Sequence, residues 1–325
     1  NDPVGTGPFK LDEWNSRSNL QLSVFDDYWG DAPAVDGLQI DLIEDQNALV
    51  NALLSGSIHI APSLPTAQVQ ALEGSEEVTL HKQLTGNYHY ICINTDREPL
   101  DDVRVRQAFM LAIDREAAVE SVFQGLAVEN TYPMSPAFEW AYPEEESFQR
   151  HDPERAKELL AEAGHPDGIE VEFLVPNLEP WRSAGEWLSQ ELEKSNIQTD
   201  MQVMEWAAFR ERTASPPFEY DVFNLQWIGD IDPDQEVSMF HRDSGLNRMY
   251  YDDDTATRLV EEQREATDQG ERGEILRELL GHLAEAGPYA VYASQRRTYG
   301  VSNTVEGFEP HPAMYVNAAE ISLSE

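Results

Sequence analysis

The stretch Asp221–Phe240 reads DVFNLQWIGDIDPDQEVSMF and combines three local signals. A short, mostly apolar run that ends at Trp227 and Ile228 predicts a buried strand. The next residues, Gly229–Asp234, form a predicted turn with three aspartates around a proline. From Gln235 onward the pattern predicts the start of a helix, with acidic side chains near its positive end.

Asp230 and Trp227 lie where a binding protein would hold a small cationic group, because a carboxylate at the end of a buried strand beside a tryptophan suits that task. An acidic loop that caps a helix has the same pattern, and the pattern alone favours this simpler interpretation. Acid–base chemistry by Asp230 and Asp232 is a third possibility. No nucleophile or partnered histidine lies nearby in the sequence.

Length and charge narrow the class of protein. The chain has 325 residues, which suits roughly two domains. Hydrophobic residues make up 41%, so the chain can form a sizeable core and lacks the composition of a disordered protein. The net charge of −39 excludes nucleic acid as an expected partner. Because the acidic residues are spread along the whole chain, the composition predicts a protein adapted to concentrated salt.

Cys92 is the only cysteine, so the chain has no internal disulfide and no zinc site built on paired thiols. A metal site of His81, His89 and Cys92 is conceivable, but their spacing fits two separate strands better. No apolar run approaches the roughly 20 residues of a membrane span. No signal peptide is visible, and the opening NDPVGTGPFKL resembles the middle of a protein. The sequence also lacks GxSxG, Walker and GxGxxG motifs.

Strand and helix patterns alternate along the chain, which predicts an α/β fold with at least one mixed sheet. Tyr88–Asn94 is apolar and aromatic and predicts a central strand. The end of the chain predicts two separate strands, Tyr289–Ala293 and Thr298–Val301. Helix N-caps are expected at Asp114, at Asp152 and in the cluster 252–254. Three tryptophans remain open between core and cleft positions, with a core position favoured for the second: Trp181, Trp187 and Trp206.

Five stretches resemble the extracytoplasmic solute-binding proteins of ABC importers, specifically the dipeptide/oligopeptide-binding family 5. They are GTGPFKLDEW at residues 5–14, SVFDDYWGD at 23–31, INTDREPLDDVRVRQAFMLAIDREAAVESVFQG at 93–125, HDPERAKELLAEAGHPDG at 151–168 and QWIGDIDPD at 226–234. The third is the most specific. The stretches are spread over nearly the whole chain.

The resemblance implies a two-lobe, periplasmic-binding-protein-like α/β fold of class II, cluster C, with a ligand enclosed between lobes joined by a hinge. Residues 1–94 and 296–325 would form the first lobe and residues 95–295 the second. Family members carry roughly 150 or more further residues before the GTGPF turn. We therefore expect an incomplete first lobe, with exposed apolar edges on the strands Phe9–Trp14 and Tyr88–Asn94.

The resemblance also implies site residues. The family's aspartate that pairs with a peptide α-ammonium matches Asp230, with Trp227 and Ile231 as its neighbours. Dipeptide binders place an arginine on an earlier loop to meet the ligand's carboxylate. Here the nearest arginine, Arg182, comes several residues late, which puts a dipeptide ligand in doubt. Asn247 matches a family asparagine that structures a loop near the cleft.

The function implied by the resemblance is binding without catalysis or cofactor. The chain would bind a peptide or another small solute and deliver it to a membrane permease. The full-length protein would be a lipoprotein anchored at the cell surface, outside the cytoplasmic membrane, and the charge predicts a haloarchaeal source. Two alternatives stay open: a hydrolase that uses the acidic pair on a peptide or glycan, and a chemosensory or chaperone-like binding module without a transport role.

Overall fold

The computed structural model describes residues 3–144, 149–229 and 232–324. The chain divides into two compact units, Asn1–Gln83 with Arg297–Glu325, and Leu84–Arg296. These units differ from the predicted lobes mainly at one boundary, because residues 84–94 belong to the second unit. The predicted lobes themselves stay a prediction. Each unit is described below by itself.

The first unit contains a three-stranded antiparallel sheet in the order β1-β2-β3. Residues near the end of the long strand β11 (Tyr289–Ser302) also contribute to this unit, since Gly300 and Val301 pair with β4. Strand β5 pairs with β11 as well. The elements of the first unit are β1 (Phe9–Asn15), β2 (Asn19–Val24), β3 (Gly37–Asp41), α1 (Gln46–Leu54), β4 (Ile60–Ala61), α2 (Thr66–Leu72), β5 (Val78–Leu84), β12 (Val305–Glu306) and β13 (Ser322–Leu323).

No residue of the sheet β1-β2-β3 is fully buried. Trp14 is 61% exposed and Ile40 is 53% exposed. Exposed apolar side chains on the strand that begins at Phe9 are therefore confirmed.

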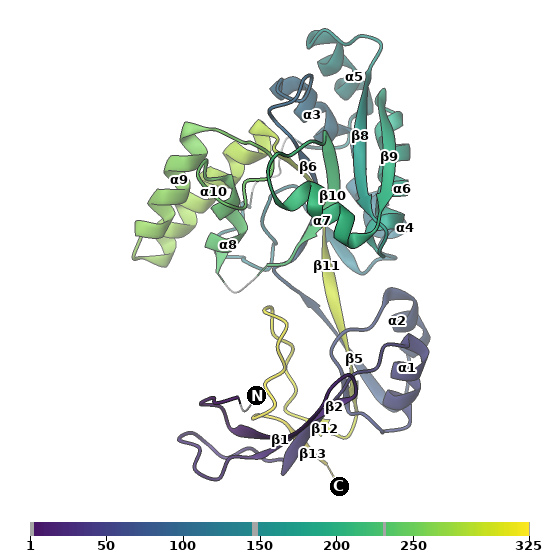
Figure 1. Cartoon of the computed structure of the whole chain (residues 1–325), viewed down its shortest axis with the longest axis vertical. Coiled ribbons are helices and arrows are strands. Elements are labelled where there is room, and N and C mark those ends of the chain that lie inside the picture. The colour runs from purple at the N-terminus through teal and green to yellow at the C-terminus, as the bar shows by residue number, and fades with distance from the viewer. Residues whose placement is uncertain (1–2, 145–148, 230–231, 325) are drawn as a thin grey trace. The chain divides into compact units, whose positions relative to one another are not determined.

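The second unit contains a larger mixed sheet with helices on both faces (Figure 1). Its elements are β6 (Tyr88–Ile93), α3 (Val103–Ala112), α4 (Arg115–Ser121), β7 (Ala127–Glu129), α5 (Pro153–Glu162), β8 (Ile169–Pro176), α6 (Trp181–Glu193), β9 (Ile197–Met204), α7 (Trp206–Ala214), β10 (Val222–Trp227), α8 (Pro233–Val237), the 3-10 helix Ser238–Phe240, α9 (Asp254–Glu265), α10 (Gln269–Ala286) and β11 (Tyr289–Ser302).

The strand β6 lies between β11 and β10, and every one of its residues is buried. Tyr88, Tyr90 and Cys92 face one core, whereas Ile91 and Ile93 face the other. The predicted central strand is confirmed. The expected loss of covering layers from it is wrong, because helices of the second unit cover both of its faces.

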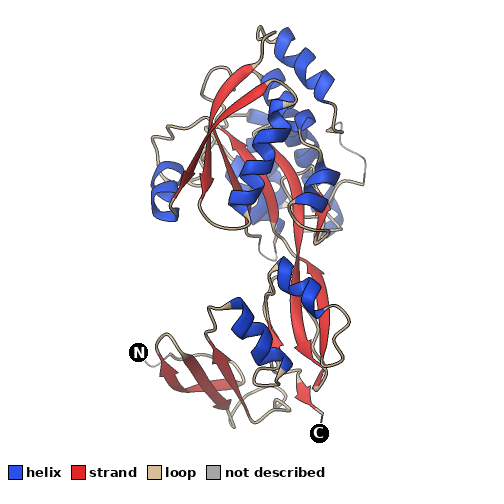
Figure 2. Cartoon of the chain, turned by 90° about the vertical axis from the view of Figure 1, so that its right-hand side faces the viewer, coloured by secondary structure: helices blue, strands red, loops and turns tan. Residues whose placement is uncertain are grey.

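The two cores use successive parts of the chain. Helices α7 to α10 contribute to the first core, on one face of the sheet. Helices α3 to α6 contribute to the second core, on the other face. Figure 2 shows these helices around the strands of the second unit. Burial on both sides explains why β6 is apolar or aromatic at every position except His89, instead of alternating.

The predicted helix caps are confirmed. The carboxylates of Asp114, Asp152 and Asp253 each accept a hydrogen bond from the backbone N–H three residues later. Helix α5 is followed by Gly164, whose φ of +99° favours glycine. These caps fix the helix starts with short-range interactions that the sequence displays directly.

The C-terminal strands were predicted as two, but β11 is one strand of 14 residues. The polar residues in its middle appeared to interrupt the pattern. They continue the strand because Ser294 and Gln295 pair with Val128 and Ala127 of β7. The prediction of two strands is therefore wrong.

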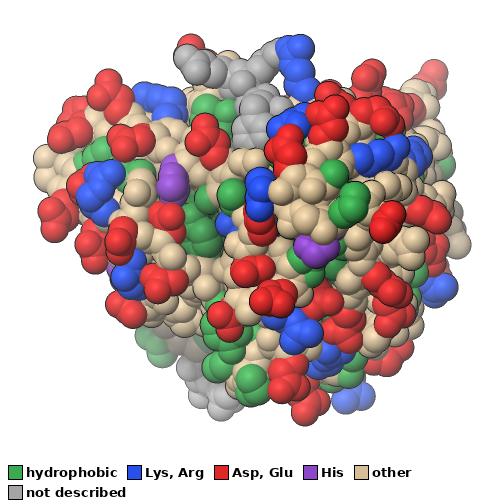
Figure 3. Space-filling model, turned by 90° about the horizontal axis from the view of Figure 1, so that it is seen from above, with side chains coloured by type: hydrophobic (Ala, Val, Ile, Leu, Met, Phe, Trp, Pro, Cys, Tyr) green, Lys and Arg blue, Asp and Glu red, His purple; other side chains and the backbone are tan. Residues whose placement is uncertain are grey.

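Acidic side chains are scattered over the face of the molecule shown in Figure 3 and outnumber the basic side chains among them. This agrees with the net charge of −39 and with acidic residues along the whole sequence. Among the described residues, no helix has the length and apolar character needed to cross a membrane.

Candidate functional site

Strands β8, β9 and β10 run parallel, so their carboxyl ends meet at one edge of the sheet. Ligands of open α/β sheets characteristically bind outside such an edge. Each strand is followed by, or ends in, a tryptophan. Trp181 begins the helix after β8, Trp206 begins the helix after β9, and Trp227 is the last residue of β10. Three separate chain segments thus bring an indole to the same edge.

Two of these indoles stack. The rings of Trp181 and Trp206 have centroids 5.7 Å apart and planes inclined by 13°. Trp206 also stacks on Phe209 at 5.8 Å, and Phe209 meets Phe223 of β10 edge to face at 5.7 Å. Trp206 is 41% exposed, whereas both phenylalanines are buried. The aromatic series therefore extends from the core to the surface at this edge.

The indole N–H groups of Trp181 and Trp227 are buried and have no hydrogen-bond partner among the described residues. An indole nitrogen can only donate. A buried donor without an acceptor costs about 1–3 kcal/mol, so such groups call for an explanation. A solute with carbonyl oxygens would supply the acceptors that these two donors need.

The turn after β10 depends on a close backbone approach at Gly229. A Cβ atom there would lie 2.3 Å from the carbonyl oxygen of Gly86 and 2.4 Å from Glu236 Oε1. The Gly229 N–H also donates to Asn87 Oδ1 at 3.1 Å. Glycine is therefore required at this position, and the turn is held against the segment that precedes β6.

Arginines from two helices hold the acidic turn. Asp232 caps α8 by accepting from the backbone N–H of Asp234 at 2.8 Å. Its two oxygens also accept from Arg272 of α10, at 2.6 and 2.9 Å. The Arg272 guanidinium lowers the pKa of Asp232 below its ordinary value. Arg264 of α9 contacts Asp234 at 2.6 Å.

The predicted site residues lie as follows. Asp230 and Ile231 lie outside the described residues. Trp227 lies at the end of β10, half-buried beside the first of the two cores. Arg182 lies on α6 directly after Trp181, is exposed, and contacts Glu186 at 3.2 Å. Arg182 and Trp227 thus belong to elements that meet at the carboxyl edge of the sheet.

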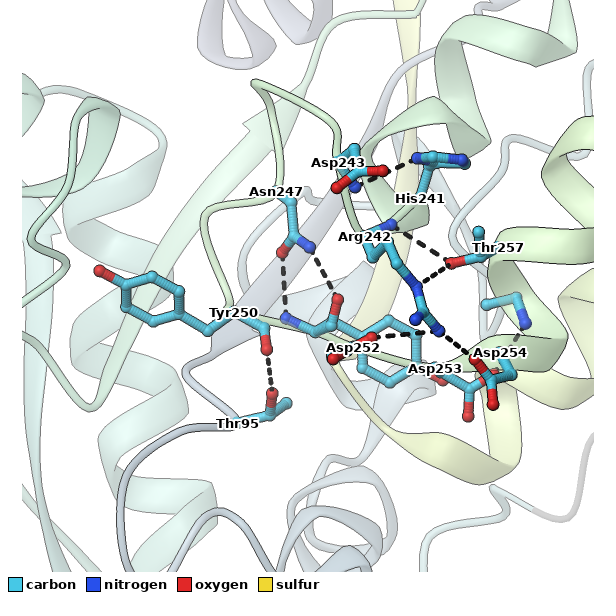
Figure 4. A network of polar contacts seen from close by, with 12 residues as sticks. Thr95, His241, Arg242, Asp243, Asn247, Tyr250, Asp252, Asp253, Asp254 and Thr257 are labelled. Carbon is cyan, nitrogen blue, oxygen red and sulfur yellow. Dashed lines mark hydrogen bonds and ion pairs between the residues drawn. The ribbon is translucent and has the colours of Figure 1, made fainter.

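Asn247 organises the loop before α9 (Figure 4). Its Nδ2 donates to the Tyr251 carbonyl at 2.7 Å, and its Oδ1 accepts from the Tyr251 N–H at 3.0 Å. Thr95 Oγ1 donates to the carbonyl of Met249 in the same loop. These contacts give Asn247 the loop-structuring place that the resemblance implies.

The second unit also has two surface cavities whose linings include charged side chains. One, of about 540 Å³, is lined by residues such as Asp114, Arg115 and Glu129. The other, of about 610 Å³, is lined by residues such as Arg106, Asp253 and His282. None of the three edge tryptophans lines either cavity.

The three residues considered for a metal site, His81, His89 and Cys92, have separate surroundings. His89 and Cys92 are three residues apart in β6 and therefore point to opposite faces of the sheet. His89 contacts Phe123 at a ring distance of 4.7 Å. His81 contacts Phe308 in the first unit. Among the described residues, no group of three metal-ligating side chains is found.

The sequence did not decide whether Trp181 and Trp206 lie in the core or in a cleft. The structure places both at the carboxyl edge of the parallel strands. A tryptophan shortly after each predicted strand was the available signal. Trp187, by contrast, packs partly buried against the second core, as predicted.

The match to a family model places this fold in a class of solute-binding proteins. The family model described as "Bacterial extracellular solute-binding proteins, family 5 Middle" matches residues 1–247. The chain belongs to this family. The predicted resemblance is thereby confirmed.

Curated relatives extend the comparison. The chain is 29% identical to heme-binding protein A of Haemophilus influenzae over 323 residues, which is 96% of this chain and 58% of that protein. It is 27% identical to oligopeptide-binding protein AppA of Bacillus subtilis, over 95% of this chain and 60% of that protein. The chain thus spans about three fifths of the length of these relatives.

Solved structures confirm the predicted fold. The substrate-binding protein CtaP of Listeria monocytogenes matches all of this chain and 68% of its own, with a TM-score of 0.90 and 21% identity. AppA of Bacillus subtilis, solved with a nonapeptide, matches 99% of this chain and 67% of its own, with a TM-score of 0.78 and 26% identity.

Proposed function

We propose that this chain is the solute-binding component of an ABC importer and that it binds a peptide or a similar small solute. The observation that carries the proposal is the convergence of Trp181, Trp206 and Trp227 at the carboxyl edge of β8, β9 and β10. Exposed aromatic surface and two buried indole donors suit a solute with both apolar parts and carbonyl groups.

The names of the relatives support a peptide-like solute without fixing it. Similar proteins are named for oligopeptides and dipeptides, and one is named for heme. Asp230 directly follows this edge in the sequence and would pair with a solute ammonium group. Such a charge-assisted pair contributes about 1.5–3 kcal/mol.

The hydrolase alternative loses support from the place of Asp232. Its carboxylate caps α8 and contacts Arg272 with both oxygens, which lowers its pKa. A carboxylate held ionised in this way is poorly suited to donate or accept a proton near neutral pH. Incubation with a peptide mixture would test this, since a binding protein returns the mixture unchanged and a hydrolase generates new termini.

We also infer that the protein acts outside the cytoplasmic membrane and delivers its solute to a permease, with a lipid anchor in the full-length form. Membership of an extracellular solute-binding family supports the location. Photocrosslinking tests the partnership in membranes that contain a permease encoded next to this protein in the genome. A permease that never crosslinks would favour the chemosensory or chaperone-like module.

The binding site can be tested with matched variants. Native mass spectrometry first identifies solutes that co-purify with the chain. Calorimetry then compares the unaltered chain with Trp206→Phe, at the edge, and Trp187→Phe, in the second core. We expect weaker binding only for Trp206→Phe. Equal affinities for all three proteins would remove this edge from the site.

A further inference from the structure

Strand β10 carries a polar side chain in the middle of an apolar run. Asn224 lies between Phe223 and Leu225 and is fully buried. Asparagine is disfavoured in strands, and its amide is costly to bury unless donors and acceptor find partners. A leucine would suit the burial pattern of β10 at this position. The amide therefore calls for a role beyond filling the core.

The amide of Asn224 joins two segments that are distant in sequence. Its Nδ2 donates to the backbone carbonyl of Trp181 at 3.0 Å, and these residues are 43 positions apart. Its Oδ1 accepts from the hydroxyl of Tyr292 at 2.8 Å, across 68 positions. Asn224 thus connects the start of α6, at the carboxyl edge of the sheet, with the strand β11.

Tyr292 is a rigid support for this amide. It is fully buried in the second core, where its ring lies 5.8 Å from His89 and 6.3 Å from Phe123. Burial raises the pKa of the Tyr292 hydroxyl, and the hydrogen bond to Asn224 opposes part of that rise. The hydroxyl therefore stays protonated and donates to Asn224 from a fixed position.

The start of α6 has little else to fix it from the inside. Pro180 stands at the N-cap and supplies no side-chain hydrogen bond to the helix. The indole N–H of Trp181 is buried and has no hydrogen-bond partner among the described residues. Ser183 donates to Glu179 at 2.7 Å, but that contact is exposed. The bond from Asn224 reaches Trp181 from the core.

We propose that Asn224 is a positioning residue of the solute site. Together with Tyr292 it holds the backbone at Trp181, and so it sets the orientation in which the Trp181–Trp206 stack meets a solute. The inference rests on the proposed function and adds to it a residue that does not touch the solute. A stack that is ordered before binding loses less freedom when the solute arrives, so it binds more tightly.

A purely structural role for Asn224 predicts a different result. Breaking its hydrogen bonds would then lower the free energy of unfolding and leave the edge unchanged. The second unit offers a matched control, because the Tyr142 hydroxyl donates to Asn130 Oδ1, also at 2.8 Å. The Asn130 amide donates to Met134 and Ser294 and not to an edge tryptophan. Tyr142→Phe therefore removes a similar hydrogen bond elsewhere.

Nuclear magnetic resonance of the indole groups tests the orientation of the stack. The chain has seven tryptophans, so isotope-labelled tryptophan gives seven indole N–H signals. Trp181→Phe and Trp206→Phe each remove one signal and thereby assign it. Stacked rings shift the signals of one another. We expect Asn224→Leu and Tyr292→Phe to shift both assigned signals. Tyr142→Phe should leave both in place.

Solute retention is measured on the same proteins by equilibrium dialysis against a tripeptide library. We expect Asn224→Leu to weaken retention by about three-fold to ten-fold, as for the loss of an ordered aromatic contact. Tyr292→Phe should weaken it less, because Asn224 keeps its bond to Trp181. Tyr142→Phe should retain the library as the unaltered chain does.

A double variant separates orientation from stability. Adding Tyr292→Phe to Asn224→Leu removes a hydroxyl that the single substitution leaves buried without its acceptor. The double variant should therefore be more stable than Asn224→Leu in urea titration. The carbonyl of Trp181 still lacks its donor, so neither the indole signals nor the retention should recover.

The outcomes distinguish the positioning role from the proposed function. Unmoved Trp181 and Trp206 signals in Asn224→Leu overturn the positioning role and leave solute binding intact. Shifted signals with unchanged retention also overturn it. A library that the unaltered chain does not retain overturns the proposed function, and the signals still decide whether Asn224 orients the stack. If Asn224→Leu does not fold, the milder Tyr292→Phe decides by the same criteria.

Discussion

Arg272 contacts Asp232 with both terminal nitrogens of its guanidinium, at 2.9 and 2.6 Å, and so ties helix α10 to the turn after β10. The two residues are 40 positions apart in the sequence. The helix that begins at Pro233 is short, and the contact restrains its first turn from outside. The geometry of the candidate site therefore depends partly on a distant helix.

Arg272→Gln should lower the free energy of unfolding by about 0.5–1 kcal/mol, since the pair is bidentate but partly exposed to solvent. Urea titration measures the change. Arg258→Gln serves as the control, because an exposed i,i+4 pair contributes about 0.3–0.5 kcal/mol. A larger loss of unfolding free energy in Arg258→Gln than in Arg272→Gln would contradict the stronger contribution expected of the Arg272–Asp232 pair.

The same pair should contribute to the pH dependence of stability. Arg272 depresses the pKa of Asp232 in the folded chain below its ordinary value of 3.8. The resulting stabilisation is present above pH 3.8 and is lost as the pH falls through the depressed value. Between pH 6 and pH 2.5 the unaltered chain should lose more stability than Arg272→Gln. If stability falls with pH equally in the two proteins, the Arg272–Asp232 pair makes no contribution to the pH dependence.

Gly229→Ala should distort the turn. The new methyl group would meet the Gly86 carbonyl at 2.3 Å, and a backbone atom cannot move aside cheaply. We expect a loss of about 1–3 kcal/mol in stability and weaker solute binding. Gly281→Ala is the control, because a Cβ there meets nothing within 4 Å and alanine favours helix α10. Similar effects of both substitutions would contradict the close approach.

Salt should stabilise the chain. With a net charge of −39, repulsion between surface carboxylates destabilises the compact state at low ionic strength. The screening length falls from about 10 Å at 0.1 M salt to about 3 Å at 1 M. The thermal midpoint should therefore rise steeply across a KCl series from low to molar concentration. A flat series would reject adaptation to concentrated salt.

Asp230→Asn should weaken binding of an ammonium-bearing peptide by about ten-fold or more, because the variant removes the charge that would pair with it. Asp232→Asn should change affinity less, since Asp232 is engaged by Arg272 and the α8 cap. Calorimetry on both variants with a peptide found to co-purify measures the difference. Unchanged affinity in Asp230→Asn would shift the solute class towards neutral molecules.

Much of the fold was predictable because its signals are local. The caps at Asp114 and Asp152, the closing Gly164 and the central strand β6 all follow from short stretches of sequence. The single long β11 was not predictable, because its polar middle is stabilised by pairing with β7. That pairing joins segments more than 160 residues apart, as in the contact between Asn130 and Ser294.

The site was only partly predictable for a topological reason. The strand order is β10-β8-β9, so β10 lies beside β8 and not beside its neighbour in sequence. Chain order alone does not place Trp227 near Trp181. Trp227 was predicted from the turn that follows it, whereas the place of Trp206 at the same edge becomes apparent only once three strands end there.

The stacked pair Trp181 and Trp206 also makes the protein its own optical probe. Two indoles at 5.7 Å with nearly parallel planes couple electronically, and one of them is 41% exposed. A solute that settles against Trp206 changes both the polarity around that ring and the coupling to its neighbour. Near-ultraviolet circular dichroism and emission spectra can therefore register occupancy of this edge without any attached dye.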